Sequence, residues 1–264
     1  MFGREQYKGT ANLKAKIFYL IYGIDQIGDR TRAFHITNYL KQRFKEQKSL
    51  RILDAGCGVG AYSFWCERNL TGAAILGVDK SNNNIELCQR ILSASSPKTK
   101  AAINFKQKDL IDLSEAIDAK FDLIICVDVL EYIKDDQHVL SNFYNILADG
   151  GQVVFHVGLT PVLYRHTLLK PDNTSAMKDK VRDNYREEEI IRKIEAAGFK
   201  IAEKRYTFGR FGSLAREMFL FIQKVAILRT LIKLVLFSVF LATAYFDWFC
   251  ENKTHQGFLF ILEK

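Results

Sequence analysis

Short apolar runs alternate with stretches of helical periodicity from Arg51 to the end of the chain. The runs have the length of β-strands, and the fourth, FDLIICVDV, is almost continuously apolar, as expected of a strand covered on both faces. The predicted strands are residues 51–56, 73–79, 102–107, 121–129, 152–157, 200–208 and 256–264, and the predicted helices among them are 62–70, 82–92, 137–147 and 187–199.

This alternation predicts right-handed βαβ units and therefore a mostly parallel sheet in an α/β fold. The glycines at 150 and 151 are expected to end the helix at 137–147. Residues 1–50 contain two amphipathic stretches, KIFYLIYGI and AFHITNYLKQRF, and are predicted to form a helical cap over the sheet. Residues 51–264 would then make up the main domain.

The composition is that of a folded protein in a reducing compartment. Of the 264 residues, 48% are hydrophobic and 26% are charged, which argues against disorder. The five cysteines are scattered and include no Cys-x-x-Cys pair, so neither a disulfide framework nor a zinc site is expected. The first residues, MFGREQYKGT, lack the apolar stretch of a secretory signal. These features predict a cytoplasmic protein.

The net charge of +8 is unevenly distributed along the chain. Residues 1–50 carry 10 basic and 4 acidic side chains, residues 51–161 carry 10 and 14, and residues 162–264 carry 18 and 12. Two basic flanks around an acidic centre suit an anionic partner surface, either phospholipid headgroups or nucleic acid. The alternative is that lysine simply keeps the surface soluble.

A glycine-rich loop, ILDAGCGVG, joins the first predicted strand to the first predicted helix. Gly56, Gly58 and Gly60 alternate with other residues, and glycine lets the backbone turn tightly and approach a ligand. In open parallel sheets, ligands bind beyond the carboxyl ends of the strands, where this loop lies. The spacing is G-x-G-x-G rather than the G-x-G-x-x-G of dinucleotide enzymes. The loop therefore predicts a cofactor site of another class.

Acidic residues follow the next three predicted strands. Asp79 ends the second strand, Asp109 follows the third, and the segment DVLEY, residues 128–132, closes the fourth. The carboxyl ends of parallel strands meet at one edge, so these groups would face one crevice. A carboxylate can accept both hydroxyls of a ribose, and another can accept a proton from an exocyclic adenine amine. The pattern predicts a nucleoside site, and the alternative is that Asp79 and Asp109 are turn residues that happen to follow strands.

Residues 50–158 resemble the class I S-adenosylmethionine-dependent methyltransferases, in particular the small-molecule branch that includes ubiquinone and menaquinone methyltransferases. The resemblance rests on LDAGCGVG, GVDKS, KDL, FDLIICVDVLEYI and LADGGQVVFHV. It implies a Rossmann-like fold with a seven-stranded, mostly parallel sheet and an antiparallel last strand, which fits QGFLFILEK after KIAEKRYTF.

The resemblance also implies S-adenosylmethionine as the cofactor. Asp54 and the loop 56–60 would hold its methionyl part, Asp79 its ribose and Asp109 its adenine amine. The residues expected to contact the cofactor are Asp54, Gly56, Cys57, Gly58, Gly60, Asp79, Lys80, Asp109, Leu110, Val127 and Asp128.

The segment after the fourth strand, VDVLEYI, narrows the class of methyl acceptor. It lacks the Asn/Asp-Pro-Pro-Tyr/Phe motif of the family members that methylate amines of nucleobases or glutamine, and the Pro-Cys pair of cytosine-C5 enzymes. The segment therefore disfavours a nucleic-acid base as acceptor. In some quinone O-methyltransferases it reads Glu-His and helps to bind a metal. Here Tyr132 follows Glu131, so no metal is expected.

A hydroxyl acceptor requires a base within hydrogen-bonding reach. His156, at the carboxyl end of the fifth strand, is the best-placed candidate, and the alternative is a hydrogen-bonded packing histidine. Residues 159–186 form a long insertion where this superfamily commonly builds its substrate lid. The candidate acceptor contacts are Tyr132, His166, Arg182 and Tyr185, and the alternative is that most of these are solvated lid residues.

An apolar insertion, residues 213–255, separates the last two predicted strands. Its charge-free centre, Leu234–Phe246, is 13 residues long, short of the ~20 that a bilayer span needs. If the last strand pairs within the sheet, both ends of the insertion lie on the same side of a membrane. This topology predicts a re-entrant hairpin or a helix pair lying in the membrane surface. The alternative is a hydrophobic lid or a dimer interface.

Together these features predict a membrane-associated, S-adenosylmethionine-dependent methyltransferase at the cytoplasmic face of the membrane. Its acceptor would be a lipophilic small molecule, such as a quinone, terpenoid or lipid, methylated on oxygen. One alternative is a soluble methyltransferase of a polar metabolite or of RNA. Another is a non-catalytic adaptor that keeps the cofactor pocket. A homodimer is compatible with the apolar insertion.

Overall fold

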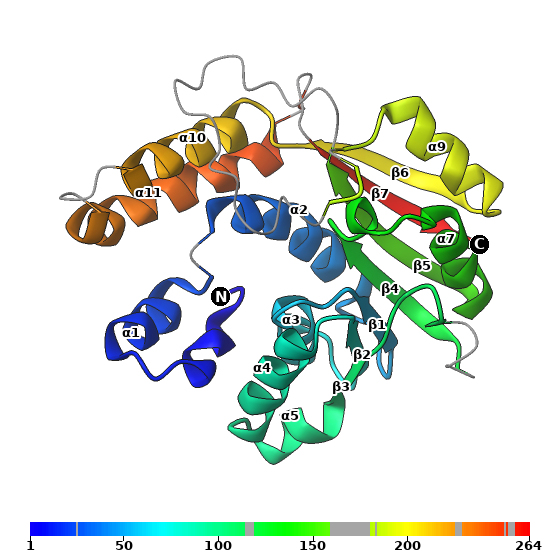
Figure 1. The fold of residues 1–264 in the computed structure, drawn as a ribbon, viewed down its shortest axis with the longest axis horizontal. Helices are drawn as coiled ribbons and strands as arrows, with labels where there is room; N and C mark the ends of the chain where they lie inside the picture. Colours follow the sequence, from blue (N-terminus) through cyan, green and yellow to red (C-terminus); the bar gives the residue numbers. More distant parts are fainter. Residues whose placement is uncertain are drawn as a thin grey trace.

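A seven-stranded sheet in the order β3-β2-β1-β4-β5-β7-β6 forms the centre of the molecule (Figure 1). The computed structural model describes residues 1–24, 26–113, 119–158, 180–182, 184–224, 229–250, 252 and 257–264. The strands are β1 (Arg51–Ala55), β2 (Ala74–Asp79), β3 (Ile103–Gln107), β4 (Phe121–Val127), β5 (Leu147–Gly158), β6 (Lys200–Thr207) and β7 (Gly257–Glu263).

The pairing of the strands confirms the predicted Rossmann-like fold. β1 pairs in parallel with β2 and β4, and β2–β3 and β4–β5 are also parallel. β7 runs antiparallel between β5 and β6. Because the strand order reverses beside β1, the crevice at the carboxyl ends of β1 and β4 is the expected ligand site of such a sheet.

Helices cover both faces of the sheet. The helical elements among the described residues are η1 (Arg4–Gly9), α1 (Leu13–Tyr22), α2 (Ile27–Phe44), α3 (Ala61–Asn69), α4 (Asn82–Ser93), α5 (Pro97–Ala102), η2 (Leu130–Tyr132), α7 (Asp136–Ile146), α9 (Glu187–Ala196), α10 (Arg210–Lys224) and α11 (Arg229–Phe249).

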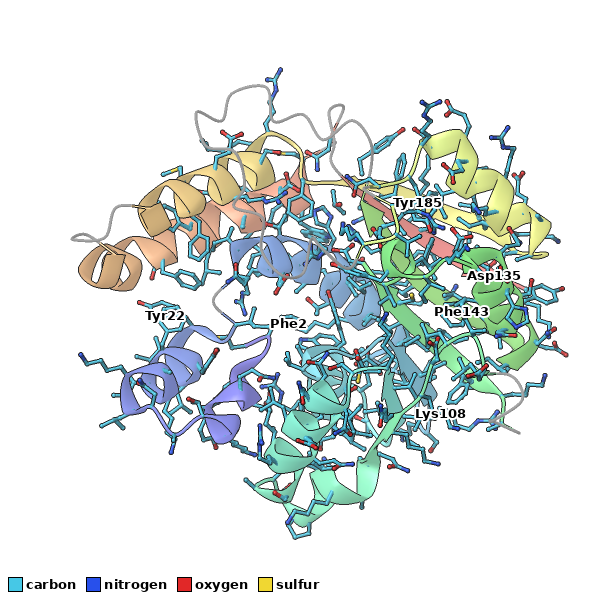
Figure 2. The ribbon with its side chains drawn as sticks, in the orientation of Figure 1. Phe2, Tyr22, Lys108, Asp135, Phe143 and Tyr185 are labelled. Atoms are coloured by element: carbon cyan, nitrogen blue, oxygen red, sulfur yellow. The ribbon has the colours of Figure 1, made fainter. Side chains whose placement is uncertain are left out.

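Side chains of the strands alternate between two core layers. In β1, Leu53 belongs to the core shared with α7 and α9, whereas Ile52 belongs to the core shared with α2, α3 and α4. Phe143 of α7 and Tyr185 lie in the first of these layers (Figure 2). The central strands are therefore buried on both faces, which explains why their sequences are nearly continuously apolar.

The two amphipathic stretches of the first 50 residues occupy different places. α2 packs on the sheet and contributes Ile36 and Leu40 to the second core. α1 has no buried residue; its Phe18 and Tyr22 rings instead contact Phe237 of α11. α2 therefore lies on the sheet, whereas α1 lies apart from it (Figure 1).

The apolar insertion forms a pair of helices, α10 and α11, that lie side by side and pack on α2 (Figure 1). A third core joins them to α2 through Ile27, Phe219 and Phe240. His35 of α2 and Asp247 of α11, both fully buried, are 3.1 Å apart at one end of this interface. No helix in the described part of the chain is both long and apolar enough to cross a bilayer.

One predicted boundary is wrong. α7 ends at Ile146, and β5 begins at Leu147, so Gly150 and Gly151 lie within the strand rather than at the end of the helix. Leu147 pairs with Phe121 of β4, and the register then shifts before Leu123 pairs with Gln152. Gly150, at a φ of 74°, takes the left-handed turn within this irregular pairing.

Candidate functional site

Two cavities lie at the carboxyl edge of the sheet and share Gly56 and Val127 in their linings. The larger, of about 260 Å³, extends over the ends of β2, β3 and β4. Its remaining lining residues are Asp79, Lys80, Ser81, Asn84, Lys108, Asp109, Leu110, Asp128, Val129, Tyr132 and Ile133. The smaller, of about 160 Å³, is lined also by Phe2, Ile24, Asp29, Arg32, Asp54, Cys57, Gly58, Val59, Ala61 and Tyr62.

The glycine loop requires glycine at the point where the cavities meet. Gly56 has a φ of 74°, and a Cβ on it would lie 2.4 Å from a methyl carbon of Val129. The backbone N–H groups of Gly56 and Cys57 both donate to the carbonyl of Val78, at 2.8 Å, and this fixes the loop on β2. Gly58 has a φ of 52°, and a Cβ there would meet nothing within 4 Å. The loop therefore presents bare backbone beside open space.

Asp79 is held rigidly at the larger cavity. Its carboxylate accepts hydrogen bonds from the backbone N–H groups of Gly58 and Ser81, both at 2.8 Å, and from the Asn84 amide at 3.3 Å. Each carboxylate oxygen has further lone pairs, so the group can still accept sugar hydroxyls. This arrangement fits the ribose of a nucleoside.

The same cavity offers groups that suit the base of a nucleoside. Asp109 lines this cavity and accepts a hydrogen bond from the backbone N–H of Ile111 at 3.1 Å. Leu110, Val127 and Ile133 supply apolar surface around it. Lys108, which directly follows β3, also lines this cavity and is labelled in Figure 2. A carboxylate beside apolar walls can recognise an amine-bearing aromatic ring.

Asp54 lies under the smaller cavity, where it is only 3% exposed. One oxygen accepts hydrogen bonds from the Ser63 backbone N–H at 3.0 Å and the Ser63 hydroxyl at 2.6 Å. Burial raises the pKa of Asp54 to about 6, although the bonds from Ser63 act in the opposite direction. An ammonium group in this cavity would favour the ionised form.

Arg32 of α2 is a site residue that the sequence analysis missed. It lines the smaller cavity, is 2.7 Å from the Asp128 carboxylate and also pairs with Asp29. Burial acts to lower the pKa of Arg32, but these two carboxylates raise it above its usual value. The guanidinium fits the carboxylate of a methionyl group. No motif surrounds Arg32 in the sequence, so only its position on α2 identifies it.

His156 does not lie where a base for the acceptor would be expected. It is 1% exposed and lines neither cavity. Its Nδ1 is 2.5 Å from an Asp128 oxygen, and its Nε2 is 2.9 Å from the Thr207 hydroxyl. Because both ring nitrogens have partners, neither is free for a substrate hydroxyl. The geometry corresponds to the alternative, a hydrogen-bonded packing histidine.

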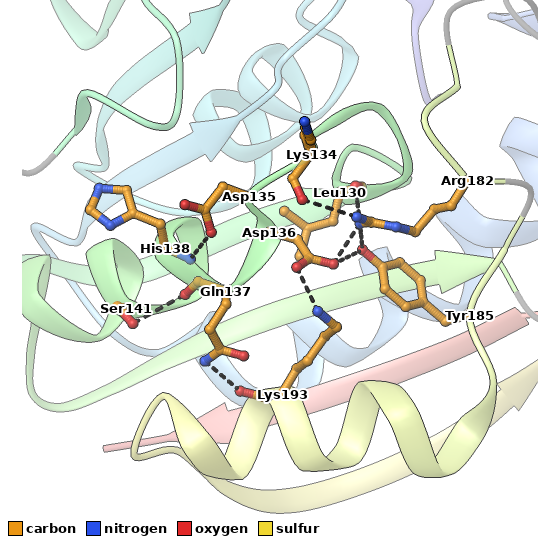
Figure 3. A network of polar contacts seen from close by, with 10 residues as sticks. All are labelled: Leu130, Lys134, Asp135, Asp136, Gln137, His138, Ser141, Arg182, Tyr185 and Lys193. Carbon is orange, nitrogen blue, oxygen red and sulfur yellow. Dashed lines mark hydrogen bonds and ion pairs between the residues drawn. The ribbon is translucent and has the colours of Figure 1, made fainter.

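Two of the expected acceptor contacts have structural partners instead (Figure 3). Asp136, 1% exposed, accepts from Arg182 at 2.5 Å, from the Tyr185 hydroxyl at 2.6 Å and from Lys193 at 2.7 Å. This network fastens the segment around Arg182 to α7 and α9, and neither Arg182 nor Tyr185 is among the residues that line the two cavities described above. Tyr132 does line the larger cavity.

The remaining expectations concern His166, the lid and a metal. His166 and most of the lid insertion, residues 159–179, lie outside the described residues. The Glu131 side chain turns to the end of β5, where it accepts from the Gly158 backbone N–H at 2.8 Å. In the part of the chain that the structure describes, no three histidine, cysteine, aspartate or glutamate side chains are grouped to hold a metal ion.

Comparison with known proteins agrees with this geometry. Residues 53–153 match a family model described as a methyltransferase domain. The chain is similar to the ubiquinone biosynthesis O-methyltransferase of Coxiella burnetii (strain RSA 331 / Henzerling II), with 24% identity over 183 residues, which are 66% of this chain and 75% of that protein.

Solved structures share the fold. The cyclase SpnF matches 88% of this chain and 81% of its own, with a TM-score of 0.60 and 17% identity. Magnesium protoporphyrin IX methyltransferase from Synechocystis PCC 6803, with bound SAH, matches 76% of this chain and 84% of its own, with a TM-score of 0.53 and 19% identity. At these identities the likeness concerns the fold alone.

The substitution Asp79→Asn is expected to raise the Kd for S-adenosylmethionine roughly tenfold to a hundredfold, because a charge-assisted hydrogen bond to the ribose becomes a neutral one. Isothermal titration calorimetry measures the change. Asp112→Asn, at an exposed residue outside both cavities, is the matched control and should bind like the unmodified chain. An unchanged Kd in Asp79→Asn would contradict the site.

The affinity for S-adenosylmethionine is expected to rise with pH through about 6, the raised pKa of buried Asp54. Below this pH the free protein keeps a proton on Asp54, and the ligand ammonium must displace it to bind. Titration calorimetry across this pH range tests the effect. In Asp54→Asn the corresponding rise should disappear, and an equally steep rise in that variant would assign the proton to another group.

Proposed function

We propose that this chain, which belongs to the class I S-adenosylmethionine-dependent methyltransferases, transfers a methyl group to an oxygen atom of a lipophilic small molecule. The observation that carries the proposal is the joined pair of cavities, in which carboxylates for a nucleoside and an arginine for a methionyl group meet at Gly56. The similarity to a ubiquinone biosynthesis O-methyltransferase favours a quinone-like, terpenoid-like or lipid acceptor.

When bound, the cofactor would supply an electrophilic methyl group: a bond from the acceptor oxygen to the methyl carbon would form as the bond from that carbon to sulfur breaks, with its electron pair left on sulfur, and the hydroxyl proton would pass to water. The contribution of the chain is largely positioning. Gly56 and Val127 line both cavities, so they mark the junction between the two halves of the site. Beside this junction, Val129, Tyr132 and Ile133 provide an aromatic and apolar wall. Such a wall suits an aromatic or isoprenoid acceptor.

Exposed apolar side chains on α1, α10 and α11 favour a membrane as the source of the acceptor. We call this set of side chains the apolar lobe. Phe211 of α10 and Phe246 of α11 contact one another, with ring centroids 6.2 Å apart, so these two helices expose apolar groups on a shared face. The lobe comprises Leu13, Ile17, Leu20 and Ile21 of α1, Phe211, Leu214 and Met218 of α10, and Val239, Tyr245, Phe246 and Phe249 of α11.

The charge of the chain is complementary to the cytoplasmic leaflet, which carries anionic lipid. Residues 1–50, which include α1, have 10 basic and 4 acidic side chains. Apolar side chains that enter the acyl boundary and basic groups that reach the headgroups together make a peripheral docking surface. Docking there would place the enzyme beside acceptors dissolved in the bilayer.

The acceptor class is tested by methyl transfer from S-adenosylmethionine labelled in its methyl group. Purified protein is incubated separately with total lipid extract, RNA and soluble metabolites from the same cells. The proposal expects label in the lipid fraction, in a product stable to mild base as an ether is. Label in RNA or in soluble metabolites would support the alternative acceptors. Binding of cofactor without transfer to any fraction would indicate an adaptor.

The double substitution Ile17→Glu and Phe246→Glu is expected to abolish binding to vesicles that contain phosphatidylserine, because each glutamate would be buried in lipid or repelled by its charge. Flotation with anionic and with neutral vesicles measures binding. Val181→Glu, at an apolar residue that is 52% exposed outside the lobe, is the matched control. If the unmodified chain ignores anionic vesicles and the double substitution instead splits a dimer, the lobe is a dimer interface.

A further inference from the structure

A chain of polar contacts crosses the carboxyl edge of the sheet from β6 to α2. The Thr207 hydroxyl at the end of β6 is 2.9 Å from His156 Nε2. His156 Nδ1 is 2.5 Å from one oxygen of Asp128, and the other oxygen of Asp128 is 2.7 Å from the Arg32 guanidinium. Asp128 lines the larger cavity and Arg32 the smaller one, whereas His156 and Thr207 are buried behind them.

We propose that His156 and Thr207 are positioning residues that set the affinity for the cofactor by holding Asp128, and through it Arg32, at the junction of the two cavities. No proton transfer by His156 is involved. The inference concerns cofactor binding, so it does not depend on the acceptor proposed above.

The charges along the chain fix the hydrogen-bond directions. Burial acts to raise the pKa of Asp128, but Arg32 and His156 lower it well below its usual value, so the carboxylate is ionised and only accepts. The ring proton of His156 therefore lies on Nδ1, and Nε2 accepts from the Thr207 hydroxyl. Burial also lowers the pKa of His156, although Asp128 opposes this, and the ring stays neutral.

Asp128 depends on these contacts because its backbone is strained. Its φ is 54°, which is uncommon for a residue other than glycine and persists only where the surroundings enforce it. His156 holds it twice, since the Asp128 N–H donates to the His156 carbonyl at 2.9 Å and the side chains bond as described. Loss of the imidazole contact would free the carboxylate to turn away from Arg32.

β7 leaves room for the contact between His156 and Thr207. β7 separates β5 from β6, and its first residue, Gly257, pairs with both Gly158 and Thr207. A Cβ on Gly257 would lie 2.7 Å from the Thr207 hydroxyl and 3.0 Å from His156 Nε2. A side chain there would push the two groups apart without entering either cavity. The absence of a side chain at Gly257 therefore allows Thr207 to contact His156.

Two substitutions of His156 separate positioning from proton transfer. In His156→Asn the amide nitrogen occupies the place of Nδ1 and can still donate to Asp128, whereas in His156→Gln the amide lies at the place of Nε2 and cannot. Calorimetry with S-adenosylmethionine should show a Kd raised roughly tenfold or more in His156→Gln, and a clearly smaller rise in His156→Asn. His138→Asn, at an exposed histidine, is the control.

The contact between Thr207 and His156 is tested by the same measurement, the Kd for S-adenosylmethionine. Thr207→Val removes the hydroxyl that fixes the tautomer and should raise the Kd severalfold, and Thr207→Ser should restore it. Gly257→Ala should also raise the Kd. The proposal is overturned if both His156 variants keep the Kd of the unmodified protein, because His156 would then have no part in cofactor binding.

A measurement on the unmodified protein keeps the inference testable should a variant fail to fold. Nitrogen-15 NMR of the histidine rings distinguishes a protonated from an unprotonated ring nitrogen. We expect the His156 ring at neutral pH to carry its proton on Nδ1 and none on Nε2. A ring protonated on Nε2 alone, or on both nitrogens, would overturn the assignment.

Discussion

The antiparallel insertion of β7 between β5 and β6 is the constraint on which the rest of the structure depends. Between β6 and β7 the chain forms α10 and α11 and then returns to the sheet beside β6. The helix pair is thereby held against α2 instead of extending away from the domain. The same pairing sets Gly257 beside Thr207 and His156. A larger residue at this position would push the Thr207 hydroxyl of β6 away from the His156 ring of β5.

α2 connects the cofactor cavities with the apolar lobe. Arg32 points into the smaller cavity, and His35, three residues later on the same helix, bonds to the buried Asp247 of α11. Phe208 lies between the two regions, with the guanidinium groups of Arg32 and Arg216 5.8 and 5.9 Å from its ring. Because α2 contributes to the smaller cavity and also packs against α10 and α11, the positions of the two regions depend on one another.

Residues at the ends of parallel strands were the easiest to place from the sequence, and Gly56, Asp79 and Asp109 line one cavity. The glycine loop, Asp79 and Asp109 follow directly from strand ends, and parallel strands bring these ends to one edge whatever else the fold contains. The sequence left the roles of Arg182, Tyr185 and His156 open because their side chains bond to distant partners: Asp136 for the first two, and Asp128 with Thr207 for the third. A polar residue in the sequence does not show which partner will satisfy it.

The sequence by itself determined the α/β class and the order of strands and helices, because apolar periodicity is a local property of the chain. The antiparallel last strand and the cofactor class came from the resemblance of its motifs to those of a known family. Only the tertiary structure decided that Arg32 reaches the cavity, that His156 is enclosed and that α1 stands clear of the sheet while α2 covers it. These outcomes depend on which elements become neighbours in space. Pairing and burial of a titratable group are fixed by such neighbours, and no spacing along the chain encodes them.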